Sequence, residues 1–190
     1  MSQPEVAAAP AALAAFETRR LRLRPVKDAD ASFILQLLNE PSWLKYIGDR
    51  GVRTLDDARR YIAEVPQRSY VVNGFGLYLV ERRDDATPLG MCGLLRRDTL
   101  PDVDIGLAFL PQHWKSGYAF EAAAATLAHA RTTLRLPRVV AITLPENGPS
   151  NRLLERLGMQ FECTLRHGDR PELLNYYGTT AAFAMDAEHV

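Results

Sequence analysis

Near the start of the chain, the spacing of hydrophobic residues changes from every second residue to the spacing of a helix. Leu21 and Leu23 are separated by arginine, a spacing of two that is typical of a half-buried strand. Apolar residues then recur at helical spacing over residues 33–38, and either Asp28 or Asp30 can cap this helix. The pattern predicts a strand followed by a helix.

A capping signal marks the next helix. Thr54 precedes Asp57 by three residues, so each side chain can bind the other residue's backbone N–H, and apolar residues share one face up to about Glu64. Aromatic and β-branched residues then dominate residues 70–82 and favour a strand. We expect a helix over about 54–64 and a strand over 70–82.

The middle of the chain has the pattern of an antiparallel meander. Short polar turns join the strand at 70–82 to predicted strands at 89–96 and 102–110. An alanine-rich helix over 117–132 and a short apolar strand over 138–144 follow. This strand, helix and strand order predicts a parallel neighbour for the strand at 102–110.

The last helix has recognisable ends. Asn147 suits the N-cap, Pro149 suits the first turn, and Gly158 suits the position just past the end. Two more strands are predicted at 159–167 and 173–183. The whole pattern indicates an α/β domain with a mixed, mostly antiparallel sheet of about seven strands, flanked by helices.

Composition indicates one domain and disfavours two kinds of partner. A chain of 190 residues with 47% hydrophobic content can bury one core. Its 23 basic and 23 acidic residues cancel, which disfavours nucleic acid and anionic membranes as partners. Residues 1–15 predict a flexible leader, and no stretch reaches the roughly 18 apolar residues of a membrane span. Cys92 and Cys163 lack metal-ligand spacing, so we expect a reduced, cytoplasmic protein without a metal.

The turn before the alanine-rich helix is a candidate phosphate site. The apolar run at 105–110 stops at Pro111, and a polar turn containing Gly117 leads into the helix. A helix that begins there presents unpaired N–H groups and the positive end of its dipole. Gly117 permits close approach of a ligand, and Ala119 leaves room beside it. An ordinary strand-to-helix connection would explain the same residues.

The stretch I-G-L-A-F-L-P-Q-H-W-K-S-G-Y-A-F-E-A, residues 105–122, resembles the acetyl-CoA-binding segment of the GNAT acyltransferase superfamily. The resemblance is to the bacterial branch that includes ribosomal-protein N-terminal acetyltransferases. That family's pyrophosphate loop usually reads Q/R-x-x-G-x-G/A, and the matching positions here are Trp114, Lys115, Ser116, Gly117, Tyr118 and Ala119. The branch often begins the loop with an aromatic residue but usually has a second glycine where this chain has Lys115. Backbone donors are retained, and Lys115 adds positive charge.

Two further motifs carry the same resemblance. N-G-P-S-N-R-L-L-E-R-L-G-M, residues 147–159, resembles the family's N-x-x-S/A-x-x-L-x-x-K-x-G-F. T-R-R-L-R-L-R-P, residues 18–25, resembles the branch's opening strand, T-x-R-L-x-L-R. The resemblance implies a GNAT N-acetyltransferase domain over 16–190, with the sheet splayed at the cofactor strand and acetyl-CoA as acyl donor.

The resemblance also implies where acetyl-CoA binds. The loop at 114–119 would hold the pyrophosphate. In the family the pantetheine arm enters the splay and pairs with exposed backbone, which by position belongs here to Leu107, Ala108 and Phe109. Asn147 matches an asparagine that contacts this arm, and Asn151 of the same motif is assigned to the cofactor with it.

Acyl transfer to an amine needs a base for the ammonium group. Asp104 precedes the cofactor motif where the branch often has a carboxylate, which makes it the candidate. A solvated aspartate at a strand end is the alternative interpretation. Asp169 and Glu172, in the turn between the last two strands, are rivals, and a lone histidine such as His167 is more often structural.

The leaving thiolate can take a proton from a positioned acid. Many GNAT enzymes have a tyrosine seven residues after the motif asparagine, but this chain has Leu154 there. Ser150 stands where a serine of the ribosomal-protein branch can approach the thiol. Its alternative role is to cap backbone N–H groups at the helix start.

Together these features predict direct acetyl transfer from acetyl-CoA to a primary amine, with a protein N-terminus as the favoured acceptor. Polyamines or aminoglycosides are alternative acceptors, and a non-catalytic acyl-CoA-binding module is the alternative class. Loops around 39–66 and 165–175 would select the acceptor. An exposed sheet edge would be compatible with a homodimer.

Overall fold

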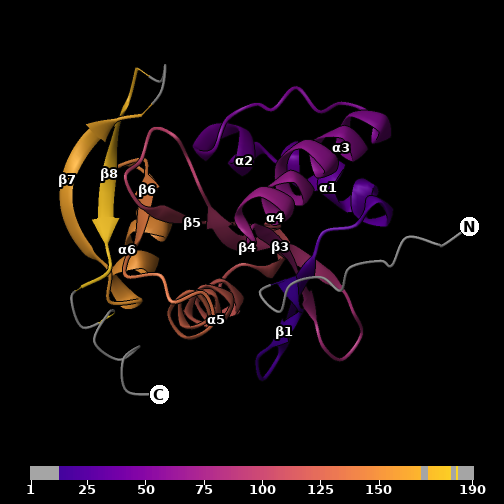
Figure 1. Ribbon diagram of the computed structural model, residues 1–190. Helices are drawn as coiled ribbons and strands as arrows, with labels where there is room; N and C mark the ends of the chain where they lie inside the picture. The colour runs from indigo at the N-terminus through magenta and orange to yellow at the C-terminus, as the bar shows by residue number, and fades with distance from the viewer. Residues whose placement is uncertain (1–12, 168–170, 181–182, 184–190) are drawn as a thin grey trace, which may run out of the picture.

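A computed structural model describes residues 13–167, 171–180 and 183 (Figure 1). The leader predicted over 1–15 lies mostly outside this part of the chain. Within it, no helix is long and apolar enough to cross a bilayer.

The described residues form one eight-stranded sheet in the order β1-β2-β3-β4-β5-β6-β8-β7. Among the described strands only β5 and β6 pair in parallel, as the strand, helix and strand order predicted. The predicted count of about seven is exceeded because a two-residue strand pairs with the opening strand. The strands are β1 (Phe16–Glu17), β2 (Leu21–Pro25), β3 (Leu77–Arg82), β4 (Pro88–Leu95), β5 (Val103–Phe109), β6 (Val139–Thr143), β7 (Gln160–Arg166) and β8 (Leu173–Gly178).

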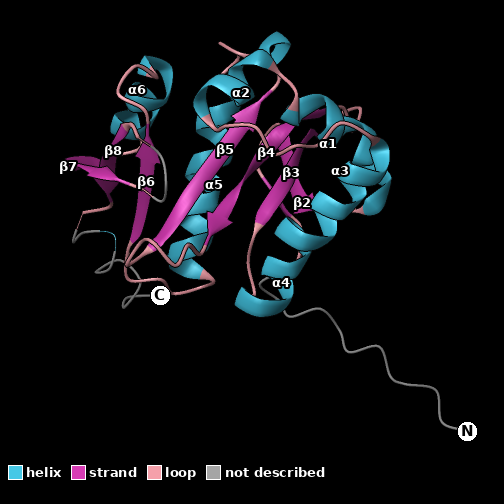
Figure 2. Ribbon diagram, turned by 90° about the horizontal axis from the view of Figure 1, so that it is seen from above, coloured by secondary structure: helices cyan, strands magenta, loops and turns pink. Residues whose placement is uncertain are grey.

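The helices divide between the two faces of the sheet (Figures 1 and 2). Helices α1 to α4 cover one face, where apolar side chains of α1 and α3 pack on β3 and β4. Helix α5 covers the other face with its alanines. The helices are α1 (Ala31–Leu38), α2 (Pro41–Tyr46), α3 (Leu55–Ile62), α4 (Arg68–Asn73), α5 (Tyr118–Thr132) and α6 (Gly148–Arg156).

Capping residues define the helix ends largely as the sequence indicated. Thr54 and Asp57 form the predicted reciprocal cap of α3, and the Asn147 side chain accepts a hydrogen bond from the first turn of α6. Gly158 lies just past α6 at φ 80°, a conformation that glycine adopts without a steric penalty. Asp30 precedes α1, but its carboxylate does not cap that helix. It binds the Arg24 guanidinium and the Lys27 N–H instead.

The strand predicted at 70–82 is wrong over its first part. Residues 68–73 form α4, and β3 begins only at Leu77. A π-helical turn at Ala63–Gln67 continues the helix through Pro66, and the buried Tyr70 hydroxyl bridges the Val26 N–H and the Leu77 carbonyl. This tertiary contact outweighs the weak β propensity of the segment, and Val71 is left 87% exposed.

The last two strands are shorter than predicted. Strand β8 ends at Gly178, before the predicted end at 183, and part of that interval lies outside the described residues. Strand β7 forms one edge of the sheet, and Phe161 on it is about half exposed, at 53%. Pairing of this edge in a homodimer stays a prediction.

Candidate active site

Strands β5 and β6 separate soon after they meet. They pair only at Val103 with Val139 and at Asp104 with Val140, although β5 continues to Phe109. Figure 2 shows the two strands diverging from this point. The rest of β5 therefore has backbone groups that face the gap without a strand partner, as expected for the cofactor strand.

Successive residues of a strand direct their backbone N–H and C=O groups to opposite edges, and this decides which backbone groups of β5 face the gap. The Leu110 N–H donates to the Leu89 carbonyl of β4 at 3.0 Å. Backbone groups two residues apart point the same way, so those of Ala108 also face β4, while those of Leu107 and Phe109 face the gap. The prediction that Ala108 offers its backbone to the cofactor is therefore wrong.

Trp114 occupies part of the remaining backbone. Its indole Nε1–H donates to the Phe109 carbonyl at 2.8 Å, and the side chain is 48% exposed. This bond ties the start of the loop at 114–119 to the end of β5. Trp114 thus acts as a structural link, and the Leu107 N–H and carbonyl, with the Phe109 N–H, are left to a ligand in the gap.

The loop before α5 contains two left-handed residues. Lys115 has φ 60° and Gly117 has φ 79°. Turns of this kind direct successive N–H groups outward and favour anions. The left-handed conformation of Lys115 explains why related loops have glycine there, and a non-glycine residue bears about 1–2 kcal/mol of strain in it. Gly117 is also the N-cap of α5, where the described residues provide no side-chain cap. The first N–H groups of α5 are thus open to a phosphate.

Sequence reasoning missed a residue behind this loop. Arg20, in the turn before β2, donates from Nη1 to the Ser116 carbonyl at 3.0 Å and from Nε to Glu121 of α5 at 2.6 Å. Its guanidinium lies 4.6 Å from the centre of the Tyr118 ring. In the sequence, this arginine was marked only by its place in the opening T-x-R-L-x-L-R motif. The motif did not indicate which groups the arginine binds.

Two polar residues, Asn147 and Ser150, lie at the start of α6, which follows β6 in the chain. Asn147 Oδ1 accepts from the Ser150 N–H at 3.3 Å, so Asn147 is the cap and Ser150 is the capped residue. Within the described residues, the Ser150 hydroxyl and the Asn147 Nδ2 make no hydrogen bond. The alternative in which Ser150 itself caps the helix is therefore wrong, and both groups are free to meet a ligand.

Asn151 is buried and fully hydrogen-bonded. Its Oδ1 accepts from Asn175 Nδ2 and the Tyr177 hydroxyl, each at 2.9 Å. Its Nδ2 donates to the carbonyls of Leu144 and Asn147 at 3.1 and 2.8 Å. Direct cofactor binding by Asn151 stays a prediction, but the contacts show a side chain that fixes the start of α6 against β8.

Asp104 is buried and paired with an arginine. Its side chain is 2% exposed, and both carboxylate oxygens accept from Arg97 Nε at 3.0 Å. Burial raises the pKa of this carboxyl above its usual value, although Arg97 acts in the opposite direction. The alternative of a solvated strand-end aspartate is therefore wrong. Since Val103 and Ile105 belong to the core under α5, Asp104 faces the α1–α4 side of the sheet.

The rival bases are less well placed or lie outside the description. Asp169 is not among the described residues. Glu172 is exposed, and His167 binds the Thr99 hydroxyl. In the described ranges, no group of three or more histidine, cysteine or acidic side chains could hold a metal ion.

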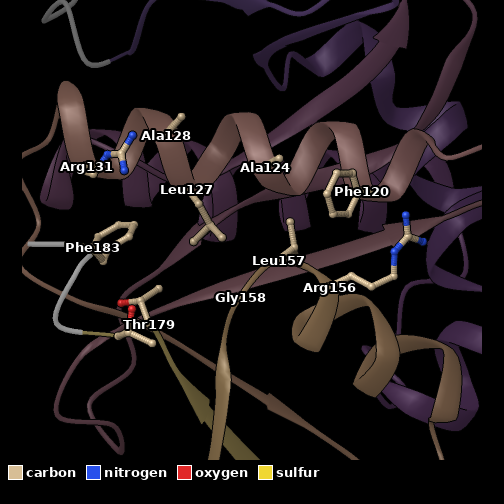
Figure 3. A pocket seen from close by; sticks show the side chains of 11 residues that line it. Phe120, Ala124, Leu127, Ala128, Arg131, Arg156, Leu157, Gly158, Thr179 and Phe183 are labelled. Carbon is tan, nitrogen blue, oxygen red and sulfur yellow. The ribbon is translucent and has the colours of Figure 1, made fainter. Parts of the chain in front are cut away.

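A hollow of about 350 Å³ lies between α5 and the junction of α6 with β7 (Figure 3). Phe120, Leu127 and Phe183 give it an apolar lining, and the Arg156 guanidinium lies 4.8 Å from the centre of the Phe120 ring. None of the residues predicted for acetyl-CoA or catalysis lines it. The hollow is therefore separate from the candidate active site.

The chain matches known proteins over most of its length. The family described as "Acetyltransferase (GNAT) domain" matches residues 20–160. A protein named uncharacterized N-acetyltransferase p20, from Bacillus licheniformis, is 32% identical over 152 residues, covering 78% of this chain and 84% of that protein.

Solved structures share the fold at lower identity. RimL, a ribosomal L7/L12 alpha-N-protein acetyltransferase in complex with coenzyme A, has a TM-score of 0.74 at 16% identity, covering 85% of this chain and 94% of that one. Spermidine N-acetyltransferase from Vibrio cholerae, in complex with CoA and spermine, has a TM-score of 0.72 at 18% identity, covering 88% and 99%. The splayed sheet, the uncapped start of α5 and the family match agree, and the chain belongs to the GNAT acetyltransferases.

Proposed function

We propose that this acyltransferase moves the acetyl group of acetyl-CoA to the α-amine of a protein N-terminus. The gap between β5 and β6, next to the uncapped start of α5, is the observation that carries acetyl-CoA binding. The pantetheine arm pairs with Leu107 and Phe109 in the gap, and Asn147 Nδ2 donates to it. The diphosphate binds N–H groups of the loop at 114–119, close to Lys115.

The chemistry is direct transfer. Asp104 accepts a proton from the substrate ammonium group, directly or through a water, and the neutral amine attacks the thioester carbonyl. The C–N bond forms, the bonded nitrogen gives up its extra proton to water, the tetrahedral oxyanion collapses, and the C–S bond breaks to release the thiolate of CoA. The Ser150 hydroxyl approaches the departing sulfur and donates a hydrogen bond to the thiolate.

The Arg97 and Asp104 pair favours an α-amine over a polyamine. An α-amine has a pKa of about 7.7–8.0, so roughly a tenth is neutral at pH 7, whereas a lysine-like amine at about 10.4 is neutral only about once in several thousand molecules. Although burial raises its pKa, a carboxyl remains a weaker base than either amine, so Asp104 deprotonates the first kind more readily than the second. The pair also has no net charge with which to attract a polycation.

An acceptor screen tests the proposal. Release of CoA thiol is measured with acetyl-CoA and three acceptor sets: peptides with free N-termini, polyamines, and aminoglycosides. Matched peptides with blocked N-termini but an internal lysine serve as controls. We expect thiol release with free N-termini only. Faster release with polyamines would overturn the acceptor assignment, and acetyl-CoA binding without release on any amine would indicate a binding module.

Replacing Ser150 by alanine should slow turnover with little change in stability. The side chain caps nothing, since Asn147 provides the cap, so the usual loss of about 0.5–2 kcal/mol for a removed cap is not expected. Melting temperature and turnover should be measured on the same sample. Asn147→Ala is the matched variant that should lose the cap stabilisation. Normal turnover by Ser150→Ala would exclude a role at the thiolate.

A further inference from the structure

We propose that Arg20 is a positioning residue that aims the phosphate loop at the CoA diphosphate. The inference rests on the proposed binding of acetyl-CoA and concerns a residue outside the loop and outside the gap. Arg20 lies 96 residues before Ser116 in the chain, yet the turn before β2 places it against the back of the loop. Its pairing with Glu121 holds the Ser116–Gly117 peptide in one orientation.

Arg20 and Thr18 both donate hydrogen bonds to the carboxylate of Glu121. Nε donates to Glu121 Oε2 at 2.6 Å, and the backbone N–H of Arg20 donates to Glu121 Oε1 at 2.9 Å. The Thr18 hydroxyl donates to the same Oε1 at 2.5 Å. With Glu121 fixed from three directions, the guanidinium has little freedom, and its Nη1 reaches the Ser116 carbonyl at 3.0 Å.

Holding one carbonyl also orients the next N–H. In a trans peptide the C=O and N–H point in opposite directions, and the described chain has no cis peptide bond. Because Arg20 binds the Ser116 carbonyl from behind, the Gly117 N–H must point away from Arg20, toward the open side of the loop. Without this bond the peptide could turn its carbonyl toward the diphosphate, which would repel the anion.

Gly117 fits closely against this arginine. A Cβ at this position would stand 3.3 Å from Arg20 Nη2, and its φ of 79° is one that other residues rarely adopt. The centre of the Tyr118 ring lies 4.6 Å from the guanidinium carbon. The guanidinium thus fills the space behind the loop and limits its movement.

The pairing of Arg20 with Glu121 also changes the electrostatic environment of the diphosphate. Burial tends to raise the pKa of Glu121, but the hydrogen bonds from Thr18 and Arg20 outweigh it and hold the pKa below its ordinary value, so the carboxylate is ionised. An unpaired carboxylate in the first turn of α5 would repel a neighbouring phosphate. Arg20 neutralises it, and the field at the helix start stays positive.

The test compares two acetyl donors, of which only one carries the diphosphate. Acetyl-CoA carries it together with the adenosine 3′-phosphate, whereas S-acetylpantetheine has the same thioester and pantetheine arm and ends before both. Arg20→Lys keeps the charge but lacks the planar fork needed to bind Glu121 and Ser116 together. We expect KM and Kd for acetyl-CoA to rise about tenfold, as for one lost charge-assisted hydrogen bond, with little change in kcat. Neither constant should change for S-acetylpantetheine.

Two variants control for effects on folding. Arg22→Lys changes an outward-facing arginine of β2. Its side chain is 49% exposed and lies 3.7 Å from Glu81, too far for a hydrogen bond, so the substitution should change neither donor's constants. Glu121→Gln weakens the hold on Arg20 but also removes a negative charge near the diphosphate, so its loss of acetyl-CoA affinity should be smaller than that of Arg20→Lys. Melting temperatures without ligand show whether each variant is folded.

The outcomes separate this inference from the proposed function. A wild-type protein that does not bind acetyl-CoA would overturn the proposed function and this inference with it. Tight binding by wild type, with unchanged constants in Arg20→Lys, would overturn the positioning role alone. An equal loss with both donors would show that Arg20 supports the fold generally, and would also overturn it.

Discussion

Asp104→Asn should lower the rate of acetyl transfer by about 10² to 10⁴ at neutral pH, while acetyl-CoA affinity changes little. A protonated amine cannot attack the thioester, and asparagine keeps the size of the side chain but removes the proton acceptor. Asp104 belongs to the short paired part of β5, just before the gap opens. The substitution therefore removes the base without altering the backbone that would hold pantetheine.

The pH dependence should identify Asp104 as the base. Burial favours the protonated carboxyl and raises its pKa, so the wild-type rate should fall as pH drops through that raised value. The variant has no such carboxyl and should lack this limb of the profile. Its deficit relative to wild type should shrink as pH rises, because more of the acceptor amine is then neutral without a base.

Asp102→Asn is the matched control, since Asp102 lies two residues earlier, is 29% exposed and is 3.7 Å from Arg138. Rates should be measured from about pH 5 to pH 9, with acetyl-CoA affinity determined separately. A near-normal rate and an unchanged profile in Asp104→Asn would transfer the role to Glu172, Asp169 or water. Lost acetyl-CoA binding would show that Asp104 and Arg97 form a structural pair.

The fold could be predicted largely because each signal was local. The reciprocal cap of Thr54 and Asp57, the Asn147 cap and the alanine-rich helix depend on neighbours within one turn. The error at Tyr70 shows the limit of this reasoning. Its hydroxyl binds Val26, 44 residues away, and such a contact leaves no trace in the local pattern.

The site was predicted less completely, because its side chains depend on distant partners. The motif placed Lys115 in the predicted phosphate loop but did not reveal its left-handed backbone. The family resemblance made Asp104 the candidate base without revealing Arg97, which pairs with it. Asn151 looked like a ligand by its place in the motif, and only its bonds to Asn175 and Tyr177 show what its amide holds.

Gly117→Glu should abolish the stabilisation of the protein by acetyl-CoA. A ligand that binds only the folded state adds about 2.7 kcal/mol to the free energy of unfolding at a hundredfold excess over its Kd. The new carboxylate would lie among the N–H groups that receive phosphate, against both shape and charge. It would also strain the backbone at φ 79° and crowd Arg20 Nη2, which lies 3.3 Å from the new Cβ.

Gly74→Glu separates the loss of the ligand site from simple strain. Gly74 ends α4 at φ 74°, and a Cβ there meets no atom within 4 Å. This variant should lose about 1–2 kcal/mol of stability and keep its full thermal shift with acetyl-CoA. Gly117→Ala, which adds the Cβ without the charge, should fall between wild type and Gly117→Glu. A full shift in Gly117→Glu would mean that the diphosphate binds elsewhere, because a carboxylate at this position cannot coexist with phosphate on the same N–H groups.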